Sequence, residues 1–179
     1  MSDTSNPPEL WALVLAGGDG RRLRALTQRL AGRPIPKQYC RIAGDRSMLE
    51  ATLDRIAPLV PAARTLVIVN RDHLHLARPQ LAGLPAENVL VQPCNRDTGP
   101  GLLWSVLAVE RRAPGALLAV LPSDHFVADG AAFRACVRGA GRRRPAGQDR
   151  PARHPARGAV VGVWLRAARV AAARQRLAT

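Results

Sequence analysis

Four short apolar runs, each bounded by turn residues, are spaced along the first 140 residues of this 179-residue chain. They read LWALVLA (10–16), RTLVIVN (64–70), NVLVQP (88–93) and ALLAVLPSD (116–124). Continuous apolar runs of this length are typical of strands that are buried on both faces of a parallel sheet. The pattern therefore predicts four parallel strands.

Longer stretches with helical periodicity separate these runs or follow them. They read SMLEATLDRIAPLV (47–60), RDHLHLARPQLAGL (71–84), TGPGLLWSVLAVERRA (98–113) and DGAAFRACVRGA (129–140). Ser47 stands where a helix N-cap is expected, and apolar positions in the stretch that follows it face inward. Strands that alternate with helices predict an α/β, Rossmann-like fold with a mainly parallel sheet, whose ligands bind at the carboxyl ends of the strands.

Composition excludes several classes of protein. The apolar runs are too short to cross a membrane, and MSDTSNPPEL does not have the cations and apolar stretch of a secretory signal. We therefore expect a cytoplasmic protein with a flexible N-terminus at 1–9. Cys40, Cys94 and Cys136 are widely spaced, which argues against a disulfide framework or a zinc cage. His73 and His75 cannot share a helix face, and we expect both at a helix surface.

The positive charge of the chain is concentrated in its last segment. The formal net charge is +14, of which +9 falls in residues 141–179 and +5 in residues 1–140. We therefore divide the chain after its N-terminus into a domain at 10–140 and an Arg/Ala/Pro-rich tail at 141–179. Such a tail could bind polyanions, but its single tryptophan offers little for stacking on bases.

A glycine-rich turn, AGGDGRR, follows the first predicted strand. Gly17, Gly18 and Gly20 allow main-chain N–H groups to turn toward an anion. Arg22 and Lys37, the only lysine, can add charge-assisted hydrogen bonds to phosphate oxygens. The spacing matches neither the dinucleotide-binding motif nor the Walker loop. Taken alone, the turn is equally compatible with a tight surface loop.

Four segments in fixed order give this loop a context: LAGGDGRRL, PKQYCRIAGDRSMLEATLDRI, QPCNRDTGPGLLW and LPSDHFV. Together they resemble the sugar-1-phosphate nucleotidyltransferases, most closely the mannose-1-phosphate guanylyltransferases, over about residues 10–138. The resemblance implies a Rossmann-like nucleotidyltransferase domain whose C-terminal half is missing here. Arg21 departs from the family, which usually has a threonine at this position.

The resemblance also implies a role for each matching residue. Arg22 would bind the triphosphate, Lys37 would bind phosphate near the reacting centre, and Asp124 would hold Mg²⁺. The remaining matching residues would bind the nucleotide, with the last three bordering base and ribose: Leu15, Ala16, Gly17, Gly18, Gly20, Gln92, Asn95 and Thr98.

The implied reaction joins GTP and mannose 1-phosphate into GDP-mannose and releases pyrophosphate, with Mg²⁺ as cofactor. Cations suit this chemistry because attack of one phosphate on another is opposed by mutual negative charge. Two alternatives stay open: a thymidylyl- or uridylyltransferase acting on glucose 1-phosphate, and an inactive nucleotide- or polyanion-binding remnant. We expect neither a membrane nor a specific nucleic acid as partner.

The tail does not continue the family pattern in its present reading frame. When the codons of residues 147–165 are read from the second base of each, synonymous choices allow GKIVLLGIPPEGPSSEYGY, which does match the family. The glycine between the last two tyrosines is fixed by Trp164 and Leu165. We therefore hypothesise a change of frame near residues 137–146, which makes 141–179 a non-native reading. The nucleotide sequence of codons 130–165 tests this hypothesis.

Overall fold

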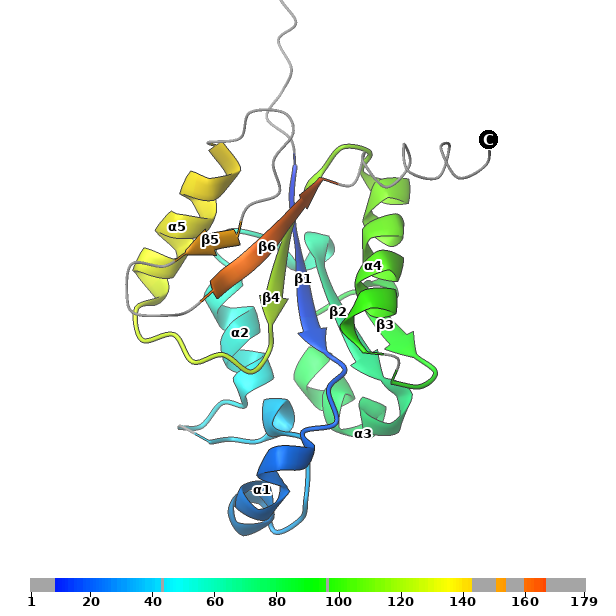
Figure 1. Ribbon diagram of the computed structural model, residues 1–179, viewed down its shortest axis with the longest axis vertical. Helices are drawn as coiled ribbons and strands as arrows, with labels where there is room; N and C mark the ends of the chain where they lie inside the picture. Colours follow the sequence, from blue (N-terminus) through cyan, green and yellow to red (C-terminus); the bar gives the residue numbers. More distant parts are fainter. Residues whose placement is uncertain (1–8, 43, 96, 143–150, 154–159, 167–179) are drawn as a thin grey trace, which may run out of the picture.

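The computed structural model describes residues 9–42, 44–95, 97–142, 151–153 and 160–166 (Figure 1). Its strands form one six-stranded sheet in the order β3-β2-β1-β4-β6-β5. The strands are β1 (Leu10–Ala16), β2 (Thr65–Asn70), β3 (Val89–Gln92), β4 (Leu117–Pro122), β5 (Pro151–Arg153) and β6 (Val160–Arg166).

The first four strands are parallel, as the apolar runs predict. β1 lies between β2 and β4, so that Leu13 is paired with Leu66 on one side and with Val120 on the other. β2 pairs with β3 in the same direction. β6 is antiparallel to β4, and β5 is antiparallel to β6. The Rossmann-like α/β fold is confirmed, whereas the two C-terminal strands were not predicted.

Helices precede or follow each parallel strand. The α-helices are α1 (Arg24–Ala31), α2 (Met48–Ile56), α3 (Leu74–Ala77), α4 (Thr98–Arg112) and α5 (Gly130–Arg142). Short 3₁₀ turns lie at η1 (Arg21–Leu23), η2 (Lys37–Tyr39), η3 (Ala62–Arg64), η4 (Arg71–His73), η5 (Arg78–Leu81) and η6 (Ala86–Asn88).

One predicted helix is interrupted and one observed helix was not predicted. The stretch 71–84 forms η4, α3 and η5 in place of one continuous helix. Pro79 lies at the start of η5, and its ring has no N–H to donate to a continuing helix. The unpredicted helix is α1, which extends beyond the carboxyl ends of the strands (Figure 1). Thr27 is its one buried residue, so α1 adds little to the core.

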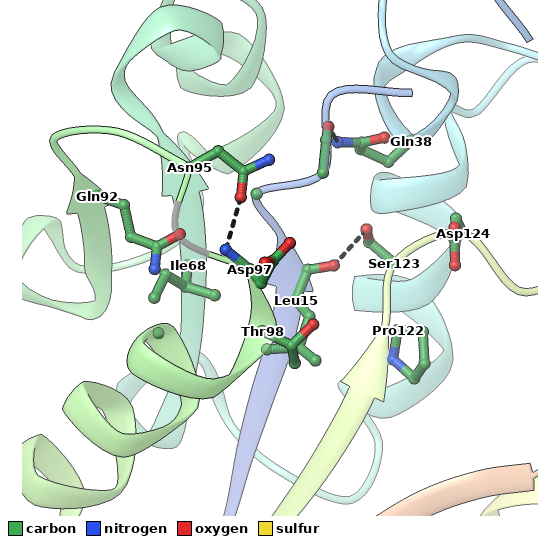
Figure 2. Close-up of a pocket in the computed structure, with 13 residues that line it drawn as sticks. Leu15, Gln38, Ile68, Gln92, Asn95, Asp97, Thr98, Pro122, Ser123 and Asp124 are labelled. Atoms are coloured by element: carbon green, nitrogen blue, oxygen red, sulfur yellow. Dashed lines mark hydrogen bonds between the residues drawn. The ribbon is translucent and has the colours of Figure 1, made fainter. Parts of the chain in front are cut away.

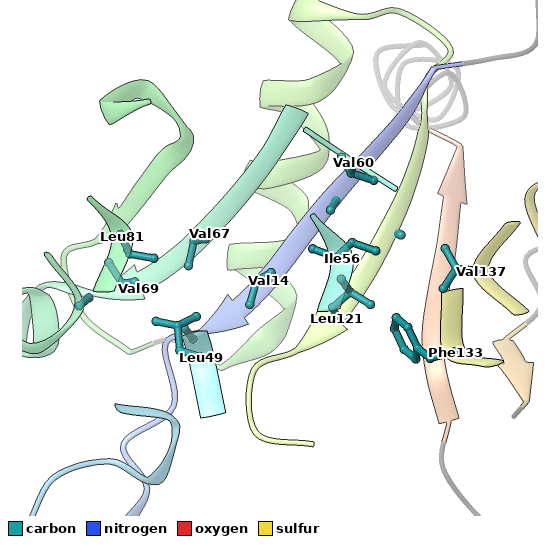
Figure 3. Close-up of a cluster of buried hydrophobic side chains, with 14 of the residues drawn as sticks. Val14, Leu49, Ile56, Val60, Val67, Val69, Leu81, Leu121, Phe133 and Val137 are labelled. Atoms are coloured by element: carbon teal, nitrogen blue, oxygen red, sulfur yellow. The ribbon is translucent and has the colours of Figure 1, made fainter. Parts of the chain in front are cut away.

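The core has two layers because successive side chains of β1 point to opposite faces of the sheet. Val14 belongs to a cluster with Leu49 and Ile56 of α2 and with Phe133 of α5 (Figure 3). Leu13 belongs to a second cluster, which packs against α4. Both faces of the central strands are therefore covered, which leaves their carboxyl ends as the place where a ligand can reach the sheet.

Ser47 caps α2 as predicted. Its hydroxyl accepts a hydrogen bond from the Glu50 N–H at 3.1 Å, and the Glu50 carboxylate accepts one from the Ser47 N–H at 2.8 Å. The two bonds form a capping box. The Ser47 hydroxyl also donates to the Gln80 side chain at 2.7 Å, which joins the start of α2 to η5.

Several predictions about the chain termini lie outside the described residues. The segment 1–9, which was expected to be flexible, is described only at its last residue, and the tail 141–179 only at 141–142, 151–153 and 160–166. The change of frame and the polyanion-binding arm therefore stay predictions. In the part of the chain that is described, no helix combines the length and apolar character that a membrane crossing requires.

Candidate functional site

A cleft of about 340 Å³ opens at the carboxyl ends of the parallel strands (Figure 2). Every parallel strand, or the loop that follows it, contributes to its lining. The lining residues are Leu15, Gly17, Gly18, Gln38, Ile68, Gln92, Asn95, Asp97, Thr98, Gly101, Pro122, Ser123 and Asp124. This is the position at which open α/β sheets bind ligands.

The glycine loop is fixed from behind by η2. The Gln38 amide donates to the carbonyl oxygens of Ala16 and Gly18 at 3.1 and 2.7 Å. The Tyr39 hydroxyl donates to the Ala16 carbonyl at 2.7 Å. The carbonyl groups of the loop therefore accept hydrogen bonds from side chains of the protein. This is expected for a loop whose N–H groups bind an anion.

Gly20 has a left-handed backbone and lies against the same segment. Its φ is 62°, and a Cβ at this position would lie 2.7 Å from the Pro36 Cα and 3.0 Å from the Lys37 nitrogen. Only glycine combines this conformation with so close an approach. The contact sets the distance between the loop and Lys37.

Lys37 and Asp124 meet at one side of the cleft. The Lys37 Nζ lies 2.7 Å from Asp124 Oδ2, and about a third of each side chain is exposed, 32% and 31% respectively. Ser123 positions the aspartate, because its N–H and its hydroxyl both donate to the Leu15 carbonyl, at 3.2 and 2.6 Å. The end of β4 is thereby attached to the end of β1, next to the glycine loop.

Most of the predicted site residues lie in or beside this cleft. Seven line it: Leu15, Gly17, Gly18, Gln92, Asn95, Thr98 and Asp124. Three others support it from outside the lining: Ala16 and Gly20 through their contacts with the η2 segment, and Lys37 through Asp124. Arg22 is exposed on η1 and does not line the cleft. Their roles in nucleotide binding stay predictions.

Arg21 does not enter the cleft either. Its guanidinium lies 3.4 Å from the Asp19 carboxylate, and 80% of its side chain is exposed. The arginine that departs from the family pattern is therefore directed to solvent and leaves the glycine loop unobstructed.

Gln92 is held between two glycines. A Cβ at Gly17 would lie 3.1 Å from the Gln92 Oε1, and a Cβ at Gly101 would lie 2.6 Å from its Nε2. The side chain is only 7% exposed, yet it lines the cleft. Gly101 lies within the quoted QPCNRDTGPGLLW motif, but its contact with Gln92 could not be inferred from spacing.

Asp97 is a cleft residue that the sequence analysis did not select. It lies between Asn95 and Thr98, both of which were selected, and its backbone has φ 61°. The Asn95 side chain accepts a hydrogen bond from the Asp97 N–H at 3.0 Å. Gln38 and Ser123 were also missed, although each is adjacent to a selected residue.

His73 lies on the 3₁₀ turn η4 and is half-buried, so it is less exposed than the surface position expected for it. Its ring centroid is 6.0 Å from that of Tyr39, and its buried Nδ1 has no hydrogen-bond partner among the described residues. Burial lowers the pKa of His73, while the carboxylates of Asp19 and Asp72 oppose this shift. His75, in contrast, is exposed as expected.

Asp124, at the end of β4, is the carboxylate of the cleft that a magnesium ion would meet next to Lys37. Among the described residues no group of three or more His, Cys, Asp or Glu side chains could hold a metal ion. Mg²⁺ is commonly bound by one or two carboxylates together with substrate phosphates and water. Asp124 fits such a shared site, because it lines the cleft and 31% of its side chain is exposed.

The family model described as "Nucleotidyl transferase" matches residues 11–147. Among curated relatives, the xanthan biosynthesis protein XanB of Xanthomonas campestris pv. campestris is 39% identical over 127 residues, which are 70% of this chain and 26% of that protein. A mannose-1-phosphate guanylyltransferase of Escherichia coli K12 is 38% identical over 136 residues, which are 74% of this chain and 27% of the relative. The chain thus spans about a quarter of the length of these relatives.

Solved structures agree with this similarity. A structure from Thermus thermophilus, described as a mannose-1-phosphate geranyltransferase, is 38% identical with a TM-score of 0.64. The similarity covers 73% of this chain and 37% of that one. A 4-diphosphocytidyl-2C-methyl-D-erythritol synthase shares the fold at 17% identity and a TM-score of 0.53, over 98% of this chain and 87% of its own.

Proposed function

Because this chain belongs to the nucleotidyl transferase family, we propose that its cleft binds a nucleoside triphosphate and transfers the nucleotidyl group to a sugar 1-phosphate. The observation that carries the proposal is the junction of the glycine loop with Lys37 and Asp124 at the carboxyl ends of β1 and β4. A cationic side chain at this junction can bind phosphate, and an anionic one can bind a metal ion, so the pair matches a metal-bound nucleoside triphosphate.

GTP and mannose 1-phosphate are the substrates that we propose. The relatives from Escherichia coli K12 and Salmonella typhimurium are named mannose-1-phosphate guanylyltransferases, at 38% and 37% identity. The products are then GDP-mannose and pyrophosphate. GTP is a cytoplasmic metabolite, so we propose that the reaction takes place in the cytoplasm.

The reaction needs no covalent bond to the protein. An oxygen of the sugar phosphate attacks the α-phosphorus, and the bond between that phosphorus and the oxygen leading to the β-phosphorus breaks. Lys37 donates to a phosphate oxygen and offsets the negative charge that develops. Main-chain N–H groups of Gly17 and Gly18 bind the triphosphate, and Arg22 reaches it from η1.

Asp124 is the residue that would hold Mg²⁺. When bound, the ion would neutralise phosphate charge and help pyrophosphate to leave. In the free protein Lys37 compensates the Asp124 carboxylate at 2.7 Å. When substrate binds, Lys37 would pair with a phosphate and Asp124 with the cation. Each side chain then exchanges one partner of opposite charge for another, so the local charge balance is kept.

Two alternatives make different predictions. A thymidylyl- or uridylyltransferase releases pyrophosphate from dTTP or UTP with glucose 1-phosphate. An inactive remnant binds a nucleotide without turnover, or binds polyanions through residues 141–179.

Pyrophosphate release from GTP and mannose 1-phosphate tests the proposal. We expect Mg²⁺-dependent release that is lost in K37M and in D124N. R64Q is the matched control, because Arg64 is a cation with 35% of its side chain exposed, close to the 32% of Lys37, and lies before the amino-terminal end of β2. Release that depends on UTP or dTTP with glucose 1-phosphate supports the first alternative.

Binding measurements separate the inactive remnant from the enzyme. Mg²⁺-dependent GTP binding without turnover identifies the remnant, and DNA binding that disappears on removal of 141–179 identifies a polyanion-binding arm. Turnover that survives in K37M and D124N contradicts the proposed roles of these two residues.

A further inference from the structure

Asp97 has a backbone conformation that side chains avoid. Its φ and ψ are 61° and −171°, in a region that glycine alone adopts readily. Among the described residues no other non-glycine residue has a positive φ. The hydrogen bond from the Asp97 N–H to the Asn95 side chain holds this conformation. Strain of this kind is concentrated at ligand sites, where a side chain must be held in one direction.

The Asp97 carboxylate does not stabilise the helix that begins beside it. Asp97 is the N-cap residue of α4, and aspartate is a favoured capping residue because its oxygens can accept from the first N–H groups. No such bond is made here. Figure 2 shows the side chain inside the cleft, between Gln92 on one side and Ser123 on the other.

Gln92 gives a second, independent sign of a ligand at this side of the cleft. Gln92 is only 7% exposed, and what remains accessible of it lines the cleft. An amide at the wall of a cleft can hydrogen-bond to a ligand that enters it. Gly17 and Gly101 restrict its position from either side. The cleft therefore presents an amide and a carboxylate at one end, and Lys37 with Asp124 at the other.

A carboxylate selects a partner that offers two neighbouring donors, because its two oxygens accept in parallel. Among the common bases, guanine alone has such an edge, formed by N1–H and the N2 amino group. Adenine places an acceptor beside a donor, and uracil and thymine place one N–H between two carbonyl groups. The proposed binding of a nucleoside triphosphate puts the base at the end of the cleft away from Lys37.

We propose, on the basis of that function, that Asp97 determines base specificity by accepting hydrogen bonds from the N1–H and N2 amino group of guanine. Gln92 borders the same base and limits its position. This inference assigns a guanine nucleotide to the cleft from its own residues and adds Asp97 to the groups that contact substrate.

Binding of GTP, ITP and XTP to the full chain with Mg²⁺ tests the inference. ITP has no N2 amino group, and XTP has a carbonyl in its place. We expect the wild-type protein to bind GTP about tenfold to a hundredfold more tightly than ITP, as the loss of one hydrogen bond to a charged group predicts. XTP should bind more weakly still.

Asp97→Asn inverts the predicted order. An asparagine presents one acceptor and one donor, which match N1–H and the 2-carbonyl of xanthine, so XTP should bind D97N more tightly than GTP does. Asparagine has nearly the shape of aspartate, so the fold should be unaffected. Asp45→Asn is the matched control, since Asp45 is exposed and lies outside the cleft, and it should keep the wild-type order.

Four outcomes overturn the inference. Equal affinities of wild-type protein for GTP and ITP, or GTP preferred by D97N as strongly as by the wild type, exclude a contact with the N2 group. An equal loss of affinity for all three nucleotides in D97N indicates a contact with ribose. Absence of binding by GTP, UTP and dTTP alike overturns the proposed function as well, which separates the two failures.

Discussion

Two glycines with the same backbone conformation allow the packing of the glycine loop to be measured. Gly20 and Gly32 have φ of 62° and 70°, so an alanine at either position is strained by its own backbone. They differ in surroundings: a Cβ at Gly20 meets the Pro36 Cα at 2.7 Å, whereas a Cβ at Gly32 meets no atom within 4 Å. The pair G20A and G32A therefore isolates the contact between the loop and the segment that carries Lys37.

The expected magnitudes follow from these two terms. The left-handed conformation is about 1–2 kcal/mol less favourable for alanine than for glycine, and this cost lowers the free energy of unfolding of both variants. Overpacking against the Pro36 backbone adds roughly 1–3 kcal/mol for G20A alone. We expect G32A to lower the free energy of unfolding by about 1–2 kcal/mol and G20A to lower it by about 2–5 kcal/mol.

Urea denaturation followed by tryptophan fluorescence measures both values, and GTP titration of the same samples measures the effect on the site. G20A should also bind GTP more weakly than G32A, because relief of the clash displaces the Lys37 peptide. If G20A and G32A lose the same stability and the same affinity, the loop is not packed on this segment as described.

Three further predictions concern single side chains. D97G relieves the strained backbone and should raise the free energy of unfolding by about 1 kcal/mol while it abolishes the preference for GTP over ITP; an unchanged or lower stability in urea refutes the strain. Burial lowers the pKa of His73, so the stability contributed by its neutral ring is complete above its unfolded pKa of about 6.5 and is lost as the pH falls below it. This loss should disappear in H73Q and persist in H75Q when unfolding is measured from pH 7.5 to 5.5, and equal slopes in the two variants contradict it. S47A removes the cap of α2 and should cost about 1–2 kcal/mol in urea, and a loss below a few tenths contradicts the role of the capping box.

Much of the fold could be predicted because the four parallel strands are apolar on both faces. The predicted run 10–16 coincides with β1, and the runs at 64–70 and 116–124 contain β2 and β4. The stretch 71–84 was predicted less well, since its apolar spacing is helical while Pro79 interrupts the backbone bonds. The leucines of α1 recur at helical spacing, but Leu26 and Leu30 remain exposed and do not contribute to the core.

Site residues that belong to a sequence motif could be predicted. Residues that reach the cleft only through tertiary contacts could not. The glycine loop, Lys37 and Asp124 were selected from the resemblance, and the structure adds the ion pair that joins the last two. Asp97 was passed over because a backbone angle cannot be inferred from its sequence neighbours. The partial burial of His73 could not be predicted, because its contact with Tyr39 joins elements far apart in the sequence.

The central claim is that the cleft at the ends of β1 and β4 binds a nucleoside triphosphate, and amide chemical-shift mapping of the isotope-labelled chain with Mg²⁺ and GTP tests it most directly. We predict that the shifted amides are those of the cleft, including Gly17, Gly18, Thr98 and Ser123. Shifts confined to the separate groove of about 420 Å³ between α2 and η5, or no shifts at all, would contradict the claim.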